Sequence, residues 1–545
     1  MDAEISKKNT KPNKIRTVLA VAACKLTRSI LRRTGRGGTA IPGIVALRIS
    51  KNVLSVPAQD MKIVVVTGTN GKTTTCNMIE HMITASGHSC LRDRSGANLL
   101  HGIASDLLCN TDWLGRSRYE YAVLECDEAA LKQVVPLIRP KVIVVTNLFS
   151  DQVDRYGSVQ NTLAEIRAGV ERSPMSTLVL NAEDPLSSSL ALNVPNRVLR
   201  FGMDASVGEQ GDVDLKDAGT CPVCGGTYTY DYHIYAHLGG FCCAGCGYSR
   251  QTPDVSVTRI SSVDAQGSTF DLKLRKKKKD ASDTGTTEKD LRDVRISLPA
   301  VYNIYNASAV VTAARALGLS AKEAAASLSS VRSSFGRMET FDLDGIRLQM
   351  ILVKNPAGCN QAFSYVTGLG EDYTAVLCLN NRTGDGHDIS WIEDTDYEKL
   401  CADPCLKKIY VAGECAGDLY ERLKKAGGDK QPSAGGSGTA DTKNATADTK
   451  NGTEDTKNGT EDTKNSTAVA KTSTEVTETS TEVTETGIEV SETSGPRMEI
   501  VTDYAAIVEK LRQDRRPAFL LPNYTSMMEL RDALSSTAGS KEFWK

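Results

Sequence analysis

The sequence has almost no excess of charge of either sign. Its 65 Lys and Arg side chains stand against 67 Asp and Glu, which gives a formal net charge of −2. A protein with this balance has no global basic field that attracts a polyanion, so the composition argues against a nucleic-acid-binding protein.

The chain also lacks any apolar run near the roughly 20 residues that a membrane-spanning helix needs. Near the start, the segment TVLAVAAC is apolar but brief, and it is followed by Lys25, Arg28, Arg32 and Arg33. This pattern predicts an amphipathic N-terminal helix rather than a signal peptide.

A disulfide framework is absent as well. The 15 cysteines are an odd number, and most are scattered singly on apolar segments. This usage is typical of reduced thiols in a cytoplasmic protein. Histidine is scarce too, with only 6 in the chain.

Two Cys-x-x-Cys pairs are the exception among the cysteines. Cys221/Cys224 and Cys243/Cys246 are each followed by glycine, and four thiolates at this spacing predict a closed tetrahedral Zn²⁺ site. Such a site has no open position for catalysis, and Cys242 breaks the spacing and is not expected to be a ligand. Arg250 is the only Lys or Arg in this region, which favours a structural staple or a partner surface over nucleic-acid binding.

Short apolar runs alternate with helix-length segments from about Met61. This alternation predicts a parallel α/β sheet with crossover helices, and its strands are KIVVVTG, YAVLECD, KVIVVTN and TLVLNAED. A second α/β unit begins near Gly336, with strands at IRLQMILVKNP, YTAVLCLNN, LKKIYVAG and RPAFLLPNY. The Lys-rich stretch LRKKKKDASDTGTTEKD is expected to be a solvated hairpin tip or loop rather than a basic binding patch.

The domain boundaries follow from this pattern and from one change in composition. Seven-residue polar repeats fill about 427–495, and they predict a disordered insertion because they have neither an apolar a/d pair nor aromatic residues to bury. We expect an N-terminal helical segment on the substrate side, a central ATPase domain with an inserted ribbon and a C-terminal α/β domain. These parts are residues 1–55, 56–330 with the ribbon at 219–250, and 331–545.

TGTNGKTTT, residues 67–75, follows a predicted strand and opens a predicted helix. Its glycines let backbone N–H groups approach phosphates at the positive end of the helix. Lys72 is placed to reach the β- and γ-phosphates of a nucleotide, and the Thr73 hydroxyl to ligate Mg²⁺. The expected phosphate-binding residues are Gly68, Thr69, Asn70, Gly71, Lys72, Thr73 and Thr74.

A bound Mg²⁺ needs a further carboxylate close to this loop. VLECDE ends a strand of the same predicted sheet, so Glu125, Asp127 or Glu128 can supply it. The residues alone do not choose among the three.

Five motifs in order, TGTNGKTTT, NLFSDQVDRYG, LNAEDP, YNIYNASA and FGRMETF, resemble the central ATPase domain of the Mur ligases. Those enzymes use ATP to activate a carboxylate as an acyl phosphate, which an amine then attacks. The resemblance implies ATP and Mg²⁺ as cofactors, Glu125 as the magnesium ligand, Asn306 at the nucleotide base and Arg337 near the phosphates. Typical members have Asp-His where this chain has Asp151-Gln152, which puts a second metal ion in question.

Within that family the ribbon, DRSGANLLHG, LVKNPAGCNQ, DGHDISWIED and LPNYTSMMELR resemble the ATP-binding subunits of lipid II isoglutaminyl synthases. The resemblance covers almost the whole chain except the repeats and the Lys-rich loop. It implies amidation of the α-carboxylate of D-glutamate in the peptidoglycan stem peptide to D-isoglutamine. It further implies ammonia from a separate GatD-like glutamine amidotransferase subunit in a heterodimer, and a place at the inner membrane face through the lipid-linked substrate.

The same resemblance gives the loop DGHDISWIED a role. An aspartate there completes the Cys-His-Asp triad of the partner subunit, with Asp388 the first choice and Asp385 the second. Asn381, Arg382 and His387 depart from the residues usual in the family, which affects the geometry expected of this loop.

A glutaminase site within this chain is a separate question. Cys415 lies in a G-x-C-x-G turn between a predicted strand and a predicted helix, the setting of a nucleophilic cysteine. No histidine follows it in the sequence, so we expect ammonia to come from elsewhere.

Lys354 and Asn355 follow a predicted strand of the second unit. By analogy with the family they face the cleft, where Lys354 would hold the acyl-phosphate oxygens as a point charge. Two other functions stay open at this point: a Mur-type ligase that adds an amino acid, and a zinc-ribbon ATPase that acts as a switch on nucleic acid.

Overall fold

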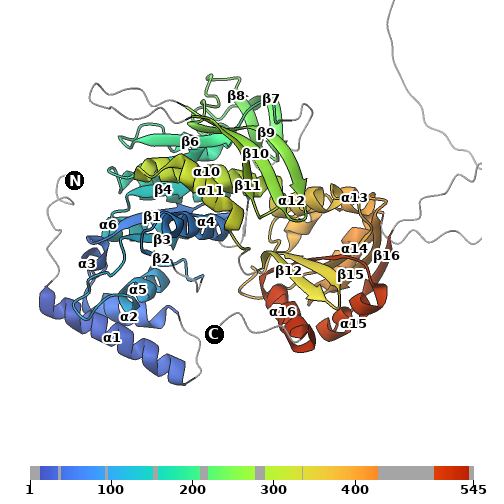
Figure 1. Ribbon diagram of the computed structural model, residues 1–545, viewed down its shortest axis with the longest axis horizontal. Coiled ribbons are helices and arrows are strands. Elements are labelled where there is room, and N and C mark those ends of the chain that lie inside the picture. The colour runs from blue at the N-terminus through green and yellow to red at the C-terminus, as the bar shows by residue number, and fades with distance from the viewer. Residues whose placement is uncertain are drawn as a thin grey trace, which may run out of the picture. The chain divides into compact units, whose positions relative to one another are not determined.

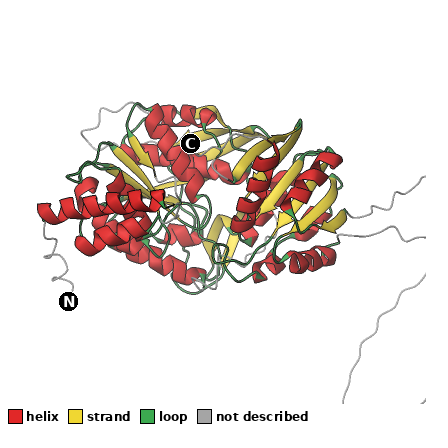
Figure 2. Ribbon diagram, turned by 90° about the horizontal axis from the view of Figure 1, so that it is seen from below, coloured by secondary structure: helices red, strands yellow, loops and turns green. Residues whose placement is uncertain are grey.

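The computed structural model contains two parallel-type sheets, each between layers of helices (Figures 1 and 2). The residues that the structure describes are 13–34, 39–92, 96–150, 158–208, 219–275, 289–333, 336–427 and 496–538. Asp151, Gln152, most of the Lys-rich loop and the seven-residue repeats lie outside these residues.

The first sheet has nine strands in the order β11-β10-β9-β6-β5-β4-β1-β3-β2. From β2 to β9 all neighbours are parallel, and β10 and β11 extend the sheet as antiparallel strands. The four strands predicted from the sequence are β1, β3, β4 and β5. The strands are β1 (Lys62–Thr67), β2 (Cys90–Arg92), β3 (Tyr121–Glu125), β4 (Val142–Val145), β5 (Thr177–Asn181), β6 (Val198–Met203), β9 (Val255–Asp264), β10 (Gly267–Leu274) and β11 (Leu291–Ile296).

Helices cover both faces of this sheet, which explains why its strands are continuously apolar. Val64 and Val66 of β1 belong to one core and Ile63 and Val65 to the other, since alternate side chains point to opposite faces. The first core packs against α4 (Lys72–Ala85), α10 (Val301–Leu317) and α11 (Ala321–Ser327). The second packs against α1 (Lys14–Arg33), α2 (Ile41–Ile49), α5 (Leu100–Cys109), α6 (Leu131–Ile138), α8 (Val159–Glu171) and α9 (Pro185–Ser189), with α3 (Ser55–Ala58) alongside.

The second sheet has six strands in the order β12-β13-β17-β14-β15-β16, parallel except for the β12–β13 hairpin. Its strands are β12 (Arg337–Leu343), β13 (Ile346–Ile351), β14 (Tyr373–Cys378), β15 (Leu406–Ala412), β16 (Arg497–Ile500) and β17 (Ala518–Pro522). One face carries α12 (Pro356–Thr367), α13 (Tyr397–Cys401) and α14 (Ala416–Lys425), and the other α15 (Tyr504–Asp514) and α16 (Tyr524–Ala538).

The two Cys-x-x-Cys pairs lie at the base of a separate hairpin, β7 (Tyr228–Tyr235) and β8 (Leu238–Cys243). The predicted α/β class, with its parallel sheet, inserted four-cysteine ribbon and smaller second α/β part, is therefore confirmed. In the described part of the chain, no helix combines the length and apolarity that crossing a bilayer requires.

Candidate nucleotide site and four-cysteine cluster

The predicted phosphate loop connects β1 to α4 and bends through two left-handed glycines. Gly68 has φ 117° and Gly71 has φ 85°. A Cβ at Gly68 would collide with Thr146 Oγ1, and one at Gly71 would collide with the Asn306 side chain. Both positions therefore require glycine for conformation and for space.

The end of β4 holds the loop in this shape. The backbone N–H of Asn70 donates to Asn147 Oδ1 at 2.9 Å, and Thr146 Oγ1 donates to the Asn70 carbonyl at 2.7 Å. Thr69 Oγ1 accepts from the Phe149 N–H at 2.9 Å. Thr146 and Asn147 were not predicted as site residues, although they stand at the end of a predicted strand of the same sheet, where polar side chains can reach the loop.

Lys72, at the start of α4, lies over the loop and is almost buried. Its Nζ is 2.8 Å from Glu128 Oε1 and donates to the Gly68 carbonyl at 2.5 Å. Asp127 instead accepts from the N–H of Ala129 at 3.1 Å, and Glu125, the predicted magnesium ligand, is half-buried at the end of β3. Of the three acids, Glu128 is the one paired with the lysine of the loop.

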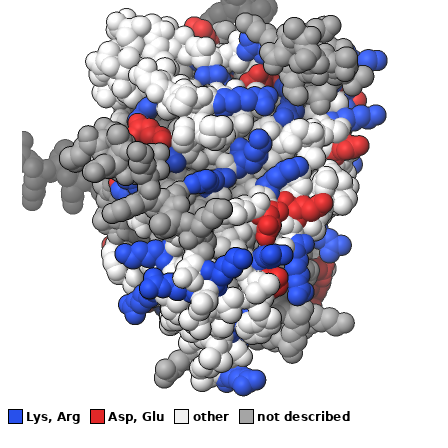
Figure 3. All heavy atoms as spheres, turned by 90° about the vertical axis from the view of Figure 1, so that its left-hand side faces the viewer, with Lys and Arg blue, Asp and Glu red and all other residues white. Residues whose placement is uncertain are grey.

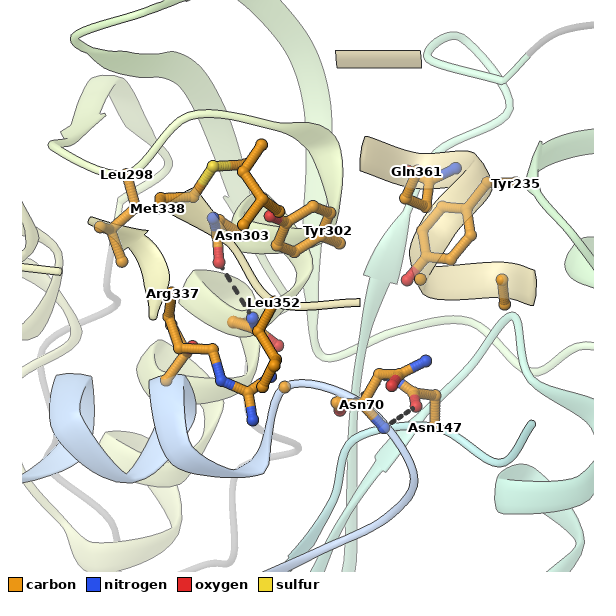
Figure 4. Close-up of a pocket in the computed structure, with 16 residues that line it drawn as sticks. Asn70, Asn147, Tyr235, Leu298, Tyr302, Asn303, Arg337, Met338, Leu352 and Gln361 are labelled. Atoms are coloured by element: carbon orange, nitrogen blue, oxygen red, sulfur yellow. Dashed lines mark hydrogen bonds between the residues drawn. The ribbon is translucent and has the colours of Figure 1, made fainter. Parts of the chain in front are cut away.

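A pocket adjoins the loop (Figure 4). Asn70, Gly71 and Thr74 contribute to its wall, and so do Asn306 and Arg337, the two residues expected at the base and near the phosphates. The side chain of Asn306 is buried, and its Nδ2 donates to Asn303 Oδ1 at 3.2 Å. Five of the predicted nucleotide residues therefore line this pocket, and the other five do not: Gly68, Thr69, Lys72, Thr73 and Glu125.

The loop also touches the second sheet. Asn70 and Asn355 exchange side-chain hydrogen bonds, Nδ2 of Asn355 to Oδ1 of Asn70 at 3.2 Å and the reverse at 3.4 Å. Asn355 caps α12 as well, because its Oδ1 accepts from the Gly358 N–H at 2.8 Å. Lys354 precedes it and is half-buried.

The loop after β14 separates the two candidate aspartates. Asp385 Oδ1 accepts from the Thr525 N–H at 2.8 Å and Oδ2 accepts from Thr525 Oγ1 at 2.5 Å, so this carboxylate ties the loop to the start of α16. Asp388 is exposed and accepts only locally, from the Ser390 N–H at 2.8 Å, and hydrogen bonding from Ser390 lowers the pKa of its carboxyl group.

Arg382 and Cys415 lie near the same strand ends. Arg382 pairs with Glu414 at 2.9 Å and with Glu529 at 2.5 Å, which braces the loop after β14 against β15 and α16. Cys415 is buried, and burial raises the pKa of its thiol. A raised pKa is the opposite of what a nucleophilic thiolate needs.

The four predicted zinc ligands converge. Their Sγ atoms all lie within 4.8 Å of one another, with Cys221 to Cys246 at 3.7 Å and Cys224 to Cys243 at 3.5 Å. A tetrahedral site with Zn–S bonds of about 2.3 Å has sulfur–sulfur edges of about 3.8 Å, so the cluster fits Zn²⁺. Left-handed Gly225 and Gly247 close the two turns, and no fourth position is left for a substrate.

The ribbon hairpin is anchored to the first sheet by the acids of LNAEDP. Glu183 is buried and pairs with Arg250 at 2.6 Å. Asp184 Oδ1 lies 3.3 Å from Nε2 of the fully buried His237. The acids of this motif therefore hold the ribbon in place, a role that the sequence did not reveal.

At its tip the hairpin reaches the nucleotide pocket. Tyr235, the last residue of β7, lines the pocket (Figure 4). Its ring stacks on that of Phe149, with ring centroids 6.1 Å apart. It also meets Tyr305 of α10 edge to face at 5.8 Å. The four-cysteine cluster and the nucleotide pocket thus lie at the two ends of one hairpin.

Comparisons with known proteins agree with this geometry. Residues 66–235 match the model of the Mur ligase middle domain, and residues 352–476 match that of the MurT ligase C-terminal region. Among solved structures, MurF from Acinetobacter baumannii aligns with a TM-score of 0.57 at 14% identity, covering 92% of this chain and 81% of its own. A pseudomurein peptide ligase type C from Methanothermus fervidus aligns with a TM-score of 0.56 at 16% identity, covering 89% of this chain and 80% of its own. These structures share the fold.

Two curated relatives are more similar in sequence. The lipid II isoglutaminyl synthase (glutamine-hydrolyzing) subunit MurT of Streptococcus pneumoniae is 33% identical over 417 residues, 76% of this chain and 88% of the relative. The subunit of the same name from Staphylococcus aureus is 32% identical over 408 residues, which are 75% of this chain and 87% of the relative. The chain therefore belongs to the Mur ligase family, in the branch formed by the MurT subunits.

Proposed function

We propose that this protein is the ATP-dependent amide ligase subunit that converts the D-glutamate α-carboxylate of the lipid II stem peptide to D-isoglutamine. The observation that carries the proposal is the pocket lined both by the phosphate loop and by residues at the start of α12, with the direct contact between Asn70 and Asn355 beside it. An ATP bound to the loop would present its γ-phosphate toward the second sheet, where a carboxylate can be activated. The curated relatives carry the name of this activity.

The reaction needs two displacements. A carboxylate oxygen attacks the γ-phosphorus and ADP leaves, which forms an acyl phosphate. Ammonia then attacks the carbonyl carbon, phosphate leaves with the carboxylate oxygen, and a proton is lost to give the amide. In the first step the ammonium group of Lys72 leaves Glu128 and neutralises the charge on the transferred phosphoryl oxygens. In the second step Lys354 holds the oxygens of the acyl phosphate.

The residues near the loop fit a magnesium ion. Thr73 lies in the first turn of α4 and offers a hydroxyl, and Glu125 at the end of β3 offers a carboxylate, oxygen ligands of the kind that Mg²⁺ prefers. Bound there, Mg²⁺ would offset the negative charge of the phosphates. At the ribbon the group would be Zn²⁺, with a structural role only.

We infer that ammonia comes from a GatD-like glutaminase in a heterodimer, at the cytoplasmic face of the membrane where lipid II is available. Exposed Asp388 is placed to orient a histidine of that partner, while Asp385 is occupied by Thr525. The buried Cys415 supports a separate source of ammonia.

The test is amidation of lipid II by the purified chain with ATP, supplied either with ammonium or with glutamine and the partner. The expected product is D-isoglutamine from both nitrogen sources, and Lys72→Ala should abolish both because the phosphoryl charge is no longer neutralised. Transfer of an amino acid instead of ammonia would assign the chain to the amino-acid-adding ligases. ATP hydrolysis stimulated by RNA or DNA, without amidation, would assign it to a nucleic-acid switch.

A further inference from the structure

Helix α1 has two apolar faces, and only one of them is used inside the protein. Thr17, Ala20, Val21 and Cys24 are buried where the helix packs on α2 and α5. On the opposite side Ile15, Leu19, Leu26 and Ile30 are 52% to 72% exposed. At 3.6 residues per turn these four fall within about 60° of one another, so they form one continuous apolar stripe along the helix.

The loop between α5 and β3 lies beside α1 and carries two more exposed apolar side chains. Trp113 and Leu114 are both exposed, and Lys25 of α1 lies 5.2 Å from the centre of the Trp113 ring. Tryptophan combines a large apolar ring with a polar N–H, the combination that is enriched where proteins meet the headgroups of a bilayer. We call the stripe of α1 together with Trp113 and Leu114 the α1 surface.

Cations border the α1 surface, and its loop carries one acid, Asp112, whose carboxylate accepts from the N–H groups of Leu114 and Arg116. Helix α1 contains no Asp or Glu, and Lys14, Lys25 and Arg32 lie along one edge of the stripe. Beside its C-terminal end is a hollow lined by Lys25, Arg28, Arg32, Arg33 and Asn110. Of these cations Arg28 approaches an acid, Asp106, at 3.8 Å, and the described residues provide no ion pair for Arg32 or Arg33. Figure 3, which faces this side of the molecule, shows Lys and Arg gathered on it.

We propose that the α1 surface docks on an anionic lipid bilayer. The apolar stripe and Trp113 enter the interface, while the cations of the hollow bind lipid phosphates of the same bilayer. An exposed apolar stripe bordered by cations matches such a surface in both polarity and charge, since the helix lies in the plane of the interface and contacts both regions of the bilayer. A second copy of the chain would bring these same cations together, which disfavours self-association through this surface.

This docking needs no lipid-linked substrate, so it goes beyond the proposed function. If the proposed function holds as well, docking would keep the nucleotide site close to substrate that diffuses in the membrane.

The test is flotation of the full chain with vesicles of phosphatidylcholine alone or mixed with phosphatidylglycerol. The wild type should bind the anionic vesicles, and added salt should weaken binding. Leu19→Gln/Leu26→Gln should lower the affinity at least about tenfold, because two apolar side chains no longer enter the interface. Arg32→Gln/Arg33→Gln should lower it about fivefold for each cation removed.

Control variants with the same kinds of substitution outside the α1 surface test whether the location of the changed side chains matters. Met175→Gln changes another highly exposed apolar side chain, and Lys322→Gln/Lys424→Gln removes two exposed cations elsewhere. Both controls should bind as the wild type does. The proposal is wrong if the wild type ignores anionic vesicles, if the controls lose as much binding as the variants, or if Leu19→Gln/Leu26→Gln instead dissolves a dimer seen by sedimentation. The vesicles contain no lipid II, so failure here leaves the amidation assay unaffected.

Discussion

Asp385 and Asp388 stand three residues apart in the loop after β14, and the protein uses their carboxylates differently. Asp385 binds both the backbone and the side chain of Thr525, so its negative charge stabilises the start of α16. Asp388 accepts hydrogen bonds from Ser390 and is exposed to solvent. At the scale of single residues, hydrogen-bond partners decide which acid is available to a partner protein.

Asp388→Asn should therefore spare ammonium-driven amidation and abolish glutamine-driven amidation in the complex. The amide cannot stabilise the imidazolium of the partner's histidine, a loss that typically reduces turnover by orders of magnitude. Parallel assays with the two nitrogen sources measure the effect. Asp385→Asn is the control: it should lower the thermal stability of the chain, because the contact with Thr525 is weakened, and it should not distinguish between the two nitrogen sources. Equal loss with both sources in Asp388→Asn would remove the residue from the triad.

A second prediction at this scale concerns Glu183. Burial raises the pKa of its carboxyl group from 4.5 to about 7, although Arg250 partly offsets the shift. The folded state therefore retains a proton that the unfolded state has lost, and this contribution to stability falls as the pH rises from about 4.5 to about 7. Glu183→Gln should flatten that decline in denaturant unfolding curves. Glu120→Gln, at an exposed carboxylate, should leave it in place.

At the scale of elements, the ribbon hairpin joins the four-cysteine cluster to the nucleotide pocket. Its base is fixed by the cluster and by the pairing of Arg250 with Glu183. Its tip is fixed by His237, which lies against Asp184, and places Tyr235 in the pocket wall. Backbone pairing of β7 with β8 connects the two ends, with register shifts between Tyr230 and His233 and between His233 and Tyr235. A cluster far from the phosphates can thus influence how a nucleotide fits.

Removing the metal, by a chelator or by Cys224→Ser/Cys246→Ser, should therefore weaken ATP binding along with the stability of the ribbon. Tyr235→Ala should weaken ATP binding about tenfold with the metal still bound, since one aromatic wall of the pocket is lost. Tyr235→Phe keeps the ring and should bind as the wild type does. Titration with a fluorescent ATP analogue and a zinc determination provide the measurements. Unchanged affinity in Tyr235→Ala would show that the ribbon does not shape the site.

At the scale of the whole molecule, Asn355 connects the second sheet to the phosphate loop. Asn355→Ala removes both the bond to Asn70 and the cap of α12, and it should cost about 1 kcal/mol of stability. Amidation should fall more than ATP binding, because the two halves of the pocket are no longer held in register. Asn355→Asp keeps the cap acceptor and should recover stability while amidation stays low. If Asn355→Asp recovered amidation as fully as stability, the role of Asn355 would be limited to capping α12.

The sequence by itself determined the local chemistry. The phosphate loop was predictable because Gly68, Gly71 and Lys72 depend on neighbours in sequence, namely a strand before them and a helix after them. The cysteine spacing determined the ribbon in the same way, and short apolar runs determined the central parallel strands of both sheets. Fold class and family follow from such local patterns, and the structure and the comparisons confirm them.

Tertiary structure alone decided which distant residues meet. Asn70 and Asn355 are far apart in the chain, as are Glu183 and Arg250, and no local pattern specifies contacts made by folding two sheets and a hairpin together. The antiparallel extension β9–β11 went unpredicted for a related reason, since its exposed alternate residues give only a weak apolar signal. The second apolar face of α1 likewise became visible only once packing had buried the first, because burial is a property of the folded chain.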